Sequence, residues 1–126
     1  QFIRTKNNQV IMDAYNANPS SMEVAISNFS KFPGSNKVMI LGDMLELGRE
    51  ANNEHLKIIN LAISSGVEKI IFVGMIFKDL VKAMPIESYL EVDELQEHLK
   101  TNPLTDKTIL IKGSRGIKLE KLLEIL

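Results

Sequence analysis

Cysteine is absent from the 126-residue sequence, which excludes disulfides, thiolate metal sites and a cysteine nucleophile. Apolar runs are short, and the longest, such as residues 38–41, have only the length of a strand, so no transmembrane span is expected. An excess of charge of one sign is missing too, since the formal net charge is −1. The basic residues are scattered and form no positively charged patch that could bind nucleic acid. We therefore expect neither a membrane nor a nucleic acid among the partners.

Two nucleotide-binding motifs are also absent. The chain has no G-x-x-x-x-G-K-[ST] phosphate loop, and no G-x-G-x-x-G follows an expected strand. The two histidines lack the spacing of metal ligands. His98 suits a polar helix surface, and the position of His55 favours a structural role over a catalytic one. The chain should not bind ATP or a dinucleotide tightly by itself, and we predict no metal site within it.

The amino-acid composition is typical of a folded domain. Hydrophobic residues make up 44% and charged residues 25% of the chain, close to globular averages. The length fits one domain spanning residues 1–126. The first residues contain neither an initiator Met nor a signal-peptide pattern, so we expect a piece of a longer protein.

Short runs rich in β-branched residues alternate with amphipathic stretches, which is typical of an α/β domain with a largely parallel sheet. Strands are expected at residues 2–5, 9–13, 37–41, 69–73, 88–92 and 108–112. The first two flank an Asn-containing turn and should form a hairpin. The prediction is a Rossmann-like, doubly wound, mostly parallel six-stranded sheet with an antiparallel edge hairpin.

Helical periodicity fills the intervals between the strands. A capping box at residues 20–23 should open a first helix that stops at Pro33. Further helices are expected at residues 49–65, 77–84, 93–100 and 119–126. The second is expected to bury Leu56, Ile59 and Ile63, and the last carries a stripe of Leu119, Leu122, Leu123 and Leu126.

Three polar loops follow expected strands, at residues 13–20, 42–48 and 113–116. Ligands of such sheets collect at the carboxyl ends of the strands. Asp13 and Asp43 occupy such positions and could bind a ribose hydroxyl, hold Mg²⁺ through water, or cap a turn. A phosphoacceptor receiver domain would need an Asp at the end of the central strand, where this chain has Val73 and Gly74.

The third loop leads from the last strand into the last helix. Its glycines permit close backbone approach, and a helix N-terminus flanked by Lys112 and Arg115 favours an anion. A carboxylate or a phosphate would suit it equally.

Taken together, these loops resemble a known family. The chain carries Asp13-Ala14-Tyr15-Asn16-Ala17-Asn18-Pro19, then Leu41-Gly42-Asp43-Met44-Leu45-Glu46-Leu47-Gly48, then Lys112-Gly113-Ser114-Arg115-Gly116. In this order and at strand ends, the segments resemble the C-terminal domain of the D-alanyl-D-alanine-adding branch of the Mur ligases. The resemblance covers essentially the whole chain, and the first two segments are long and specific. The Asp-Asn-Pro-Arg motif of the diamino-acid-adding ligases is absent.

The resemblance implies a three-domain enzyme whose N-terminal UDP-sugar domain and central ATPase domain are missing here. It implies that ATP and Mg²⁺, held mainly by the central domain, activate the UDP-N-acetylmuramoyl-tripeptide carboxylate as an acyl phosphate, which D-alanyl-D-alanine then attacks. The present domain would close over the nucleotide against its own central domain, and no catalytic residue is expected in it. By the family pattern, nucleotide contacts fall to Asp13, Tyr15, Asn16 and Asn18. Cleft or substrate contacts fall to Asp43, Glu46, Lys112, Ser114 and Arg115.

The sequence therefore predicts a part of an ATP-dependent amide-forming ligase of peptidoglycan synthesis, cytoplasmic, bacterial and monomeric, and inactive in isolation. One alternative is a different ligase of the superfamily, such as a folylpolyglutamate type, which would lack the run from Asp13 to Pro19. Another is a non-catalytic nucleotide-binding or interaction module.

Overall fold

A computed structural model describes residues 1–126. The strands are β1 (Phe2–Arg4), β2 (Gln9–Asp13), β3 (Lys37–Gly42), β4 (Lys69–Val73), β5 (Glu87–Tyr89) and β6 (Thr108–Lys112). The α-helices are α1 (Pro19–Lys31), α2 (Ala51–Ser64), α3 (Met75–Val81) and α4 (Val92–Thr101). Three 3₁₀ segments complete the chain: η1 (Gly48–Glu50), η2 (Arg115–Ile117) and η3 (Leu119–Ile125).

The strands form one six-stranded sheet in the order β1-β2-β6-β3-β4-β5. β1 pairs antiparallel with β2, and every other pair is parallel. The predicted fold class is confirmed, including the edge hairpin, whose turn is closed by a bond from the Thr5 amide to the Asn8 carbonyl at 2.9 Å. Because the central parallel strands pair side by side, their carboxyl ends all point to the same edge of the sheet.

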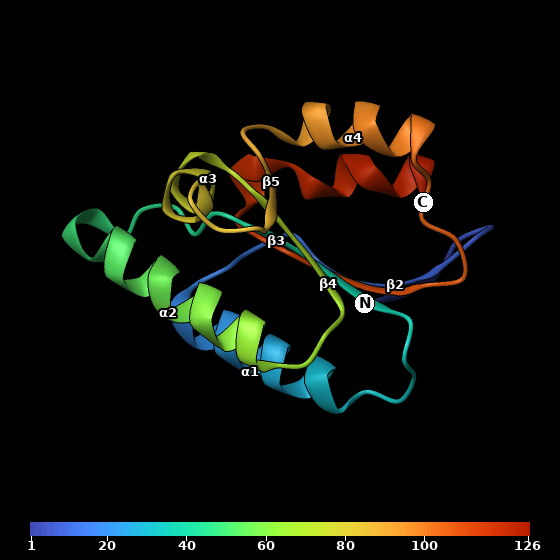
Figure 1. The fold of residues 1–126 in the computed structure, drawn as a ribbon, viewed down its shortest axis with the longest axis horizontal. Coiled ribbons are helices and arrows are strands. Elements are labelled where there is room, and N and C mark those ends of the chain that lie inside the picture. The colour runs from blue at the N-terminus through green and yellow to red at the C-terminus, as the bar shows by residue number, and fades with distance from the viewer.

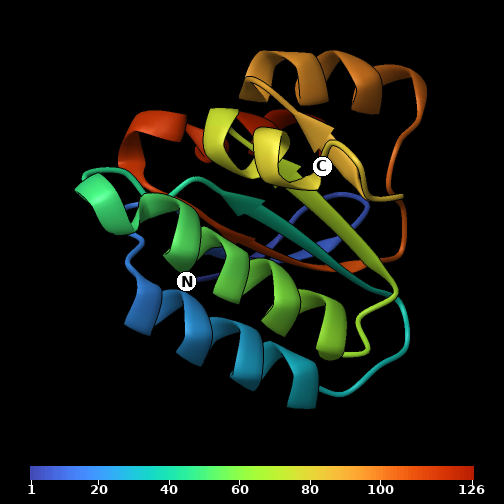
Figure 2. The ribbon, with the colours of Figure 1, turned by 60° about the vertical axis from the view of Figure 1, so that its left-hand side comes forward.

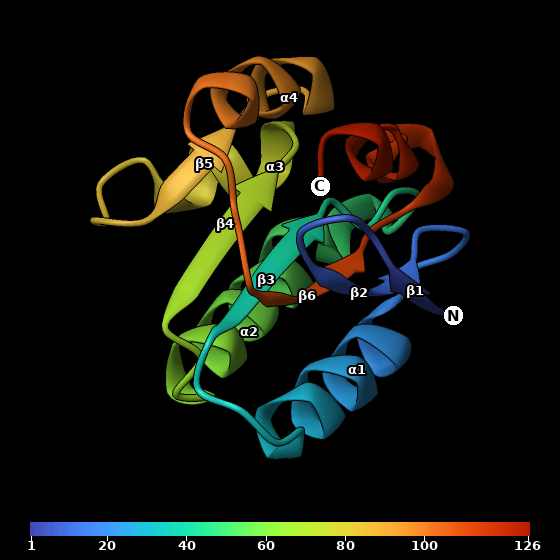
Figure 3. The same ribbon diagram turned by 90° about the vertical axis from the view of Figure 1, so that its right-hand side faces the viewer.

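Helices cover both faces of the sheet (Figure 1). Figure 2 shows α1 and α2 side by side on one face, and Figure 3 shows α4 and the C-terminal η3 on the other. Alternate side chains of each central strand enter opposite cores: Ile40 and Ile111 pack under α4 and η3, whereas Met39 and Leu110 pack under α1 and α2. Burial on both faces explains why these strands read as nearly continuous apolar runs.

Several element details differ from the sequence-based predictions. The cap of α1 is Asn18, whose side chain accepts from the Ser21 amide at 2.9 Å, and not the predicted box at residues 20–23. Of the three residues predicted to be buried in α2, Ile59 is buried, but the prediction was wrong for Leu56 and Ile63, which are 40% and 49% exposed. The helix buries His55, Ile58 and Ala62 beside Ile59. The helix is rotated about one position from the predicted face, which brings His55 into the core.

The C-terminal segment is 3₁₀ helix and not the predicted α-helix. Lys118 adopts a left-handed φ of 61° between η2 and η3, which breaks the segment in two. Leu119, Leu122 and Leu126 are nevertheless buried as predicted, while Leu123 is only partly buried. None of the helices combines the length and the apolar character that a membrane-spanning segment requires.

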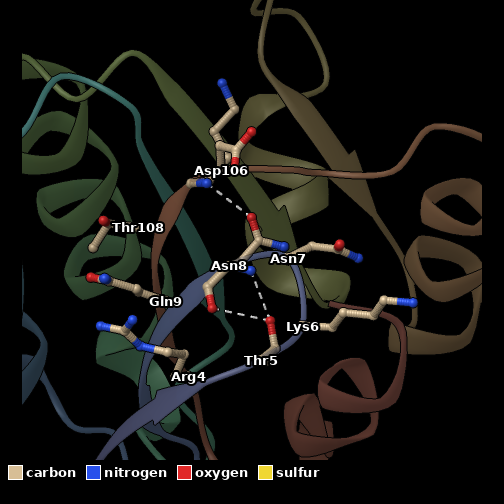
Figure 4. Close-up of a pocket in the computed structure, with 9 residues that line it drawn as sticks. Arg4, Thr5, Lys6, Asn7, Asn8, Gln9, Asp106 and Thr108 are labelled. Carbon is tan, nitrogen blue, oxygen red and sulfur yellow. Dashed lines mark hydrogen bonds between the residues drawn. The ribbon is translucent and has the colours of Figure 1, made fainter.

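A polar hollow of about 350 Å³ lies at the amino ends of β2 and β6 (Figure 4). Asn8 is buried beside it and binds three backbone groups: its amide nitrogen donates to Leu104 and Leu126, and its oxygen accepts from the Lys107 amide at 2.9 Å. Asn8 thus ties the hairpin turn to the loop before β6 and to the last residue of the chain. This hollow is at the opposite edge of the sheet from the predicted site.

Candidate functional site

The three predicted loops meet at the carboxyl edge because β2, β6 and β3 are adjacent and parallel. The loops after β3 and β6 are joined directly. The Ser114 amide donates to the Asp43 carbonyl at 3.0 Å, and the Ser114 hydroxyl accepts from the Leu45 amide at 2.9 Å. A Cβ on Gly113 would lie 2.8 Å from the Gly42 Cα. Glycine at position 113 is therefore what lets these two backbones approach.

Asp13 and Lys112 form an ion pair across neighbouring strands. They are register partners of β2 and β6, and the Lys112 ammonium contacts Asp13 Oδ2 and donates to the Asn16 carbonyl at 3.2 Å. The Asp13 side chain is 50% exposed, whereas that of Lys112 is 2% exposed. Lys112 therefore binds the first loop from beneath and leaves one side of the carboxylate open to solvent.

Asp13 stands between two hollows. One, of about 300 Å³, is lined by Asp13, Tyr15, Arg115 and Glu120 among others. The other, of about 560 Å³, runs along the start of α1 and includes Asp13 and Asn18. A ligand on this edge can thus approach Asp13 from either side.

Tyr15 and Arg115 connect the first and third loops at the surface. The Tyr15 side chain is highly exposed, and the Arg115 guanidinium lies over its ring at 5.1 Å from the centroid. Asn18 is partly committed, since its side-chain oxygen caps α1 and only its amide group remains available. All four nucleotide candidates, Asp13, Tyr15, Asn16 and Asn18, are exposed residues.

Asp43 occupies a similar place in the sequence but turns into the protein. Its carboxylate is buried and accepts from the amides of Ile76 and Phe77, each at 2.9 Å, at the start of α3. Gly74 has a φ of 126°, and a Cβ there would lie 2.3 Å from the Asp43 Cγ. The absence of a side chain at Gly74 makes room for the carboxylate, which fastens the second loop to α3.

His55 supports the same loop from α2. It is fully buried, its Nε2 accepts from the Met44 amide at 2.9 Å, and its Nδ1 lies 2.6 Å from the Ala51 carbonyl. The ring is therefore neutral with its proton on Nδ1. Burial lowers the pKa of His55 below 6.5, although the bond to Ala51 and the nearby Asp43 oppose that shift. The predicted structural role of His55 is confirmed.

The other cleft candidates divide by exposure. Glu46 is exposed at the tip of the second loop in a left-handed conformation, with φ of 65°. Ser114 and Lys112 are buried, and their polar atoms already bind neighbouring loops. Of the five predicted cleft residues, only Glu46 and Arg115 direct exposed side chains outward. No group of three or more His, Cys, Asp or Glu side chains is placed to hold a metal ion.

Two features of the candidate site were missed by the sequence-based predictions. Gly74 and the first amides of α3 complete the environment of Asp43, and Glu120 of η3 joins the hollow beside Asp13 and Tyr15. A glycine directly between a strand and a helix was the available signal for the first. Nothing in the local sequence around Glu120 indicates its position, because η3 reaches the site only through tertiary packing.

A family model described as "Mur ligase, glutamate ligase domain" matches residues 1–115. The chain belongs to the Mur ligase family. Similar curated relatives include the UDP-N-acetylmuramoyl-tripeptide–D-alanyl-D-alanine ligases of Rickettsia prowazekii, 34% identical over 98% of this chain, and of Buchnera aphidicola from Acyrthosiphon pisum, 40% identical over 94%. This Mur ligase domain covers only 28% and 26% of the length of those relatives.

Solved structures give the same assignment. The crystal structure of MurF from Acinetobacter baumannii superposes with a TM-score of 0.81 at 29% sequence identity. The superposition covers 98% of this chain and 28% of that one. The fold of the Mur ligase domain is thus found as one part of a longer ligase.

Proposed function

We propose that this chain is the C-terminal domain of an ATP-dependent ligase that joins D-alanyl-D-alanine to UDP-N-acetylmuramoyl-tripeptide in the bacterial cytoplasm. The relatives named for that reaction cover nearly the whole chain. The observation that carries the proposal is the half-exposed Asp13 carboxylate between two hollows, at an edge where all three motif loops meet. The N-terminal and central domains of the proposed ligase lie outside this chain.

The residues at this edge fit a nucleoside. A carboxylate accepts hydrogen bonds from two hydroxyls, and Asp13 has one oxygen, Oδ1, that Lys112 does not engage. The exposed ring of Tyr15 lines one of the hollows beside Asp13, and Asn18 lines the other. Asn16 is exposed in the loop between them. We assign Asp13 to the ribose of ATP, with Tyr15, Asn16 and Asn18 lining the nucleotide.

The exposed charges of the other two loops suit the substrate side of the cleft. ATP, with Mg²⁺, supplies the phosphoryl group that activates the tripeptide carboxylate, and the central domain holds both. Arg115 presents a cation suited to the carboxylate of D-alanyl-D-alanine. The buried groups Asp43, Ser114 and Lys112 shape and hold these loops, so closure of the domain brings a preformed surface to the nucleotide.

The test uses the full-length enzyme that contains this chain. Asp13→Ala should raise the KM for ATP roughly tenfold, since losing hydrogen bonds to a charged acceptor costs about 1.5–3 kcal/mol. Asp79→Ala, which removes an exposed carboxylate on α3, is the matched control. Product formation should require D-alanyl-D-alanine and not proceed with glutamate. An unchanged KM for ATP would remove Asp13 from the nucleotide site, and preference for glutamate would reassign the ligase branch.

A further inference from the structure

We propose that Lys112 is a positioning residue: it holds the Asp13 carboxylate and the loop at residues 13–18 in the geometry that receives the nucleotide, without touching substrate. This inference rests on the proposed function of Asp13. It assigns Lys112 a role different from the substrate contact expected from the family pattern.

Strand geometry places the two side chains together. Lys112 follows Leu110 on the face of β6 that packs under α1, where a fully buried position would ordinarily hold an apolar side chain. Asp13 is its register partner on β2, so both side chains leave the sheet on the same face. The lysine stem fills the core position, and its ammonium emerges at the end of the strand beneath Asp13.

The contacts of the ammonium account for its effect on the loop. Its two acceptors are Asp13 Oδ2 and the Asn16 carbonyl, which belong to the strand end and to the loop that follows. Fixing Oδ2 leaves Oδ1 of the half-exposed carboxylate without a bond to Lys112, and fixing Asn16 sets the course of the backbone beside Tyr15. Asp13 lines both hollows; Lys112 lines only the one along α1, and because its side chain is 2% exposed, a ligand there meets chiefly Asp13.

Burial makes the pair asymmetric, and this asymmetry can be tested. Removing Asp13 leaves a buried ammonium without its counter-ion, which is strongly unfavourable. Removing the ammonium leaves a carboxylate that is half-exposed and can be hydrated. Asp13→Ala should therefore lower the thermal stability more than Lys112→Met does. The double variant should recover part of the loss.

The experiment measures ATP kinetics and thermal unfolding in the full-length enzyme for Lys112→Met, Asp13→Ala and the double variant. Lys112→Met should raise the KM for ATP about three- to tenfold with a smaller change in kcat, because the Asp13 carboxylate and the loop at residues 13–18 lose their orientation while the nucleotide-contacting side chains remain. The KM of the double variant should stay well below the product of the two single effects, since Lys112 acts largely through Asp13. Lys112→Gln, which keeps a donor, should give an intermediate value and replaces the Met variant if that one does not fold.

Lys37→Met is the matched control. Lys37 is likewise a strand lysine, although it is only partly buried. Its ammonium donates to the carbonyls of Phe29, Ser30 and Phe32 at the end of α1, away from the site. Its loss should lower stability and leave the KM for ATP unchanged.

Three results are decisive. A wild-type KM in Lys112→Met, together with a raised KM in Asp13→Ala, would overturn the positioning role and leave the proposed function intact. A double-variant KM equal to the product of the two single effects would show that Lys112 acts independently of Asp13, and would also overturn it. An unchanged KM in Asp13→Ala would instead refute the nucleotide role of Asp13 on which the inference rests.

Discussion

Asp13 and Asp43 stand at the carboxyl ends of β2 and β3, the two strands that flank β6, yet their surroundings differ completely. The Asp13 carboxylate is half-exposed and held on one side by a buried lysine. The Asp43 carboxylate is buried against Gly74 and accepts two amides of α3. One loop thus leaves its carboxylate accessible, whereas the carboxylate of the other is hydrogen-bonded inside the protein. Position at a strand end alone does not make an aspartate a ligand-binding residue.

Gly74→Ala should have the largest effect on stability, because it disturbs the buried surroundings of the Asp43 carboxylate. The new Cβ would meet the Asp43 carboxylate at 2.3 Å, at a backbone φ of 126° that favours glycine. We expect a loss of about 4 kcal/mol in the free energy of unfolding, from strain and overpacking together. Urea unfolding of the domain measures it, with Gly34→Ala as the control, since Gly34 also has a positive φ but open space around it. Similar losses for both variants would show that backbone conformation alone matters at Gly74.

Asp43→Asn should follow, with a loss of roughly 2–3 kcal/mol, because a charged acceptor of two buried amides is replaced by a group that accepts more weakly and brings an unmatched donor. Asp79→Asn, on the exposed surface of α3, should leave stability unchanged. The same urea titration compares the two variants. A stable Asp43→Asn variant with impaired ligation would instead place Asp43 in the substrate cleft.

Protonation of His55 at mildly acidic pH should weaken the hydrogen bond by which His55 supports the loop after β3. Burial lowers its pKa below 6.5, so the unfolded chain binds the proton more readily than the folded one. Stability should therefore fall as the pH drops below about 6.5. His55→Gln should be less stable at pH 7 and show a shallower decline between pH 7 and pH 5. His98→Gln, at a partly exposed histidine of α4, is the comparison variant. Equal slopes for all three proteins would exclude His55 as the source.

Arg115→Ala should have the smallest effect on stability, and it tests whether the exposed loops bind the substrate. Its contact with the exposed Tyr15 ring is of a kind worth about 0.5–1 kcal/mol. In the full-length enzyme, a contact to the dipeptide carboxylate would raise the KM for D-alanyl-D-alanine severalfold, and a contact made only in the transition state would lower kcat. Steady-state kinetics with varied dipeptide separate the two. Wild-type values of both constants would make Arg115 an ordinary surface residue.

Much of the architecture could be predicted from the chain. Residues 69–73 are nearly all apolar, so burial on both faces of a parallel sheet followed directly. The Asn-containing turn at residues 6–8 predicted the hairpin, because turn formation also depends on local sequence. The prediction failed for the buried face of α2. Leu56 and Ile63 fit an apolar stripe, but the helix buries His55 and Ile58. A buried histidine with two backbone partners cannot be recognised from hydrophobic periodicity.

The sequence by itself determined the fold class, the family resemblance and the three loops that meet at one edge, because strand patterning and short motifs depend on local chemistry. Only the tertiary structure decided which of their polar side chains remain free. Lys112 reads as an accessible cation in its loop, and the packing of β6 under α1 turns it into a buried partner of Asp13. From the sequence, Asp43 is expected to face the cleft, but in the structure Gly74 and the start of α3 enclose its carboxylate. Such outcomes depend on contacts between segments far apart along the chain, which no local pattern contains.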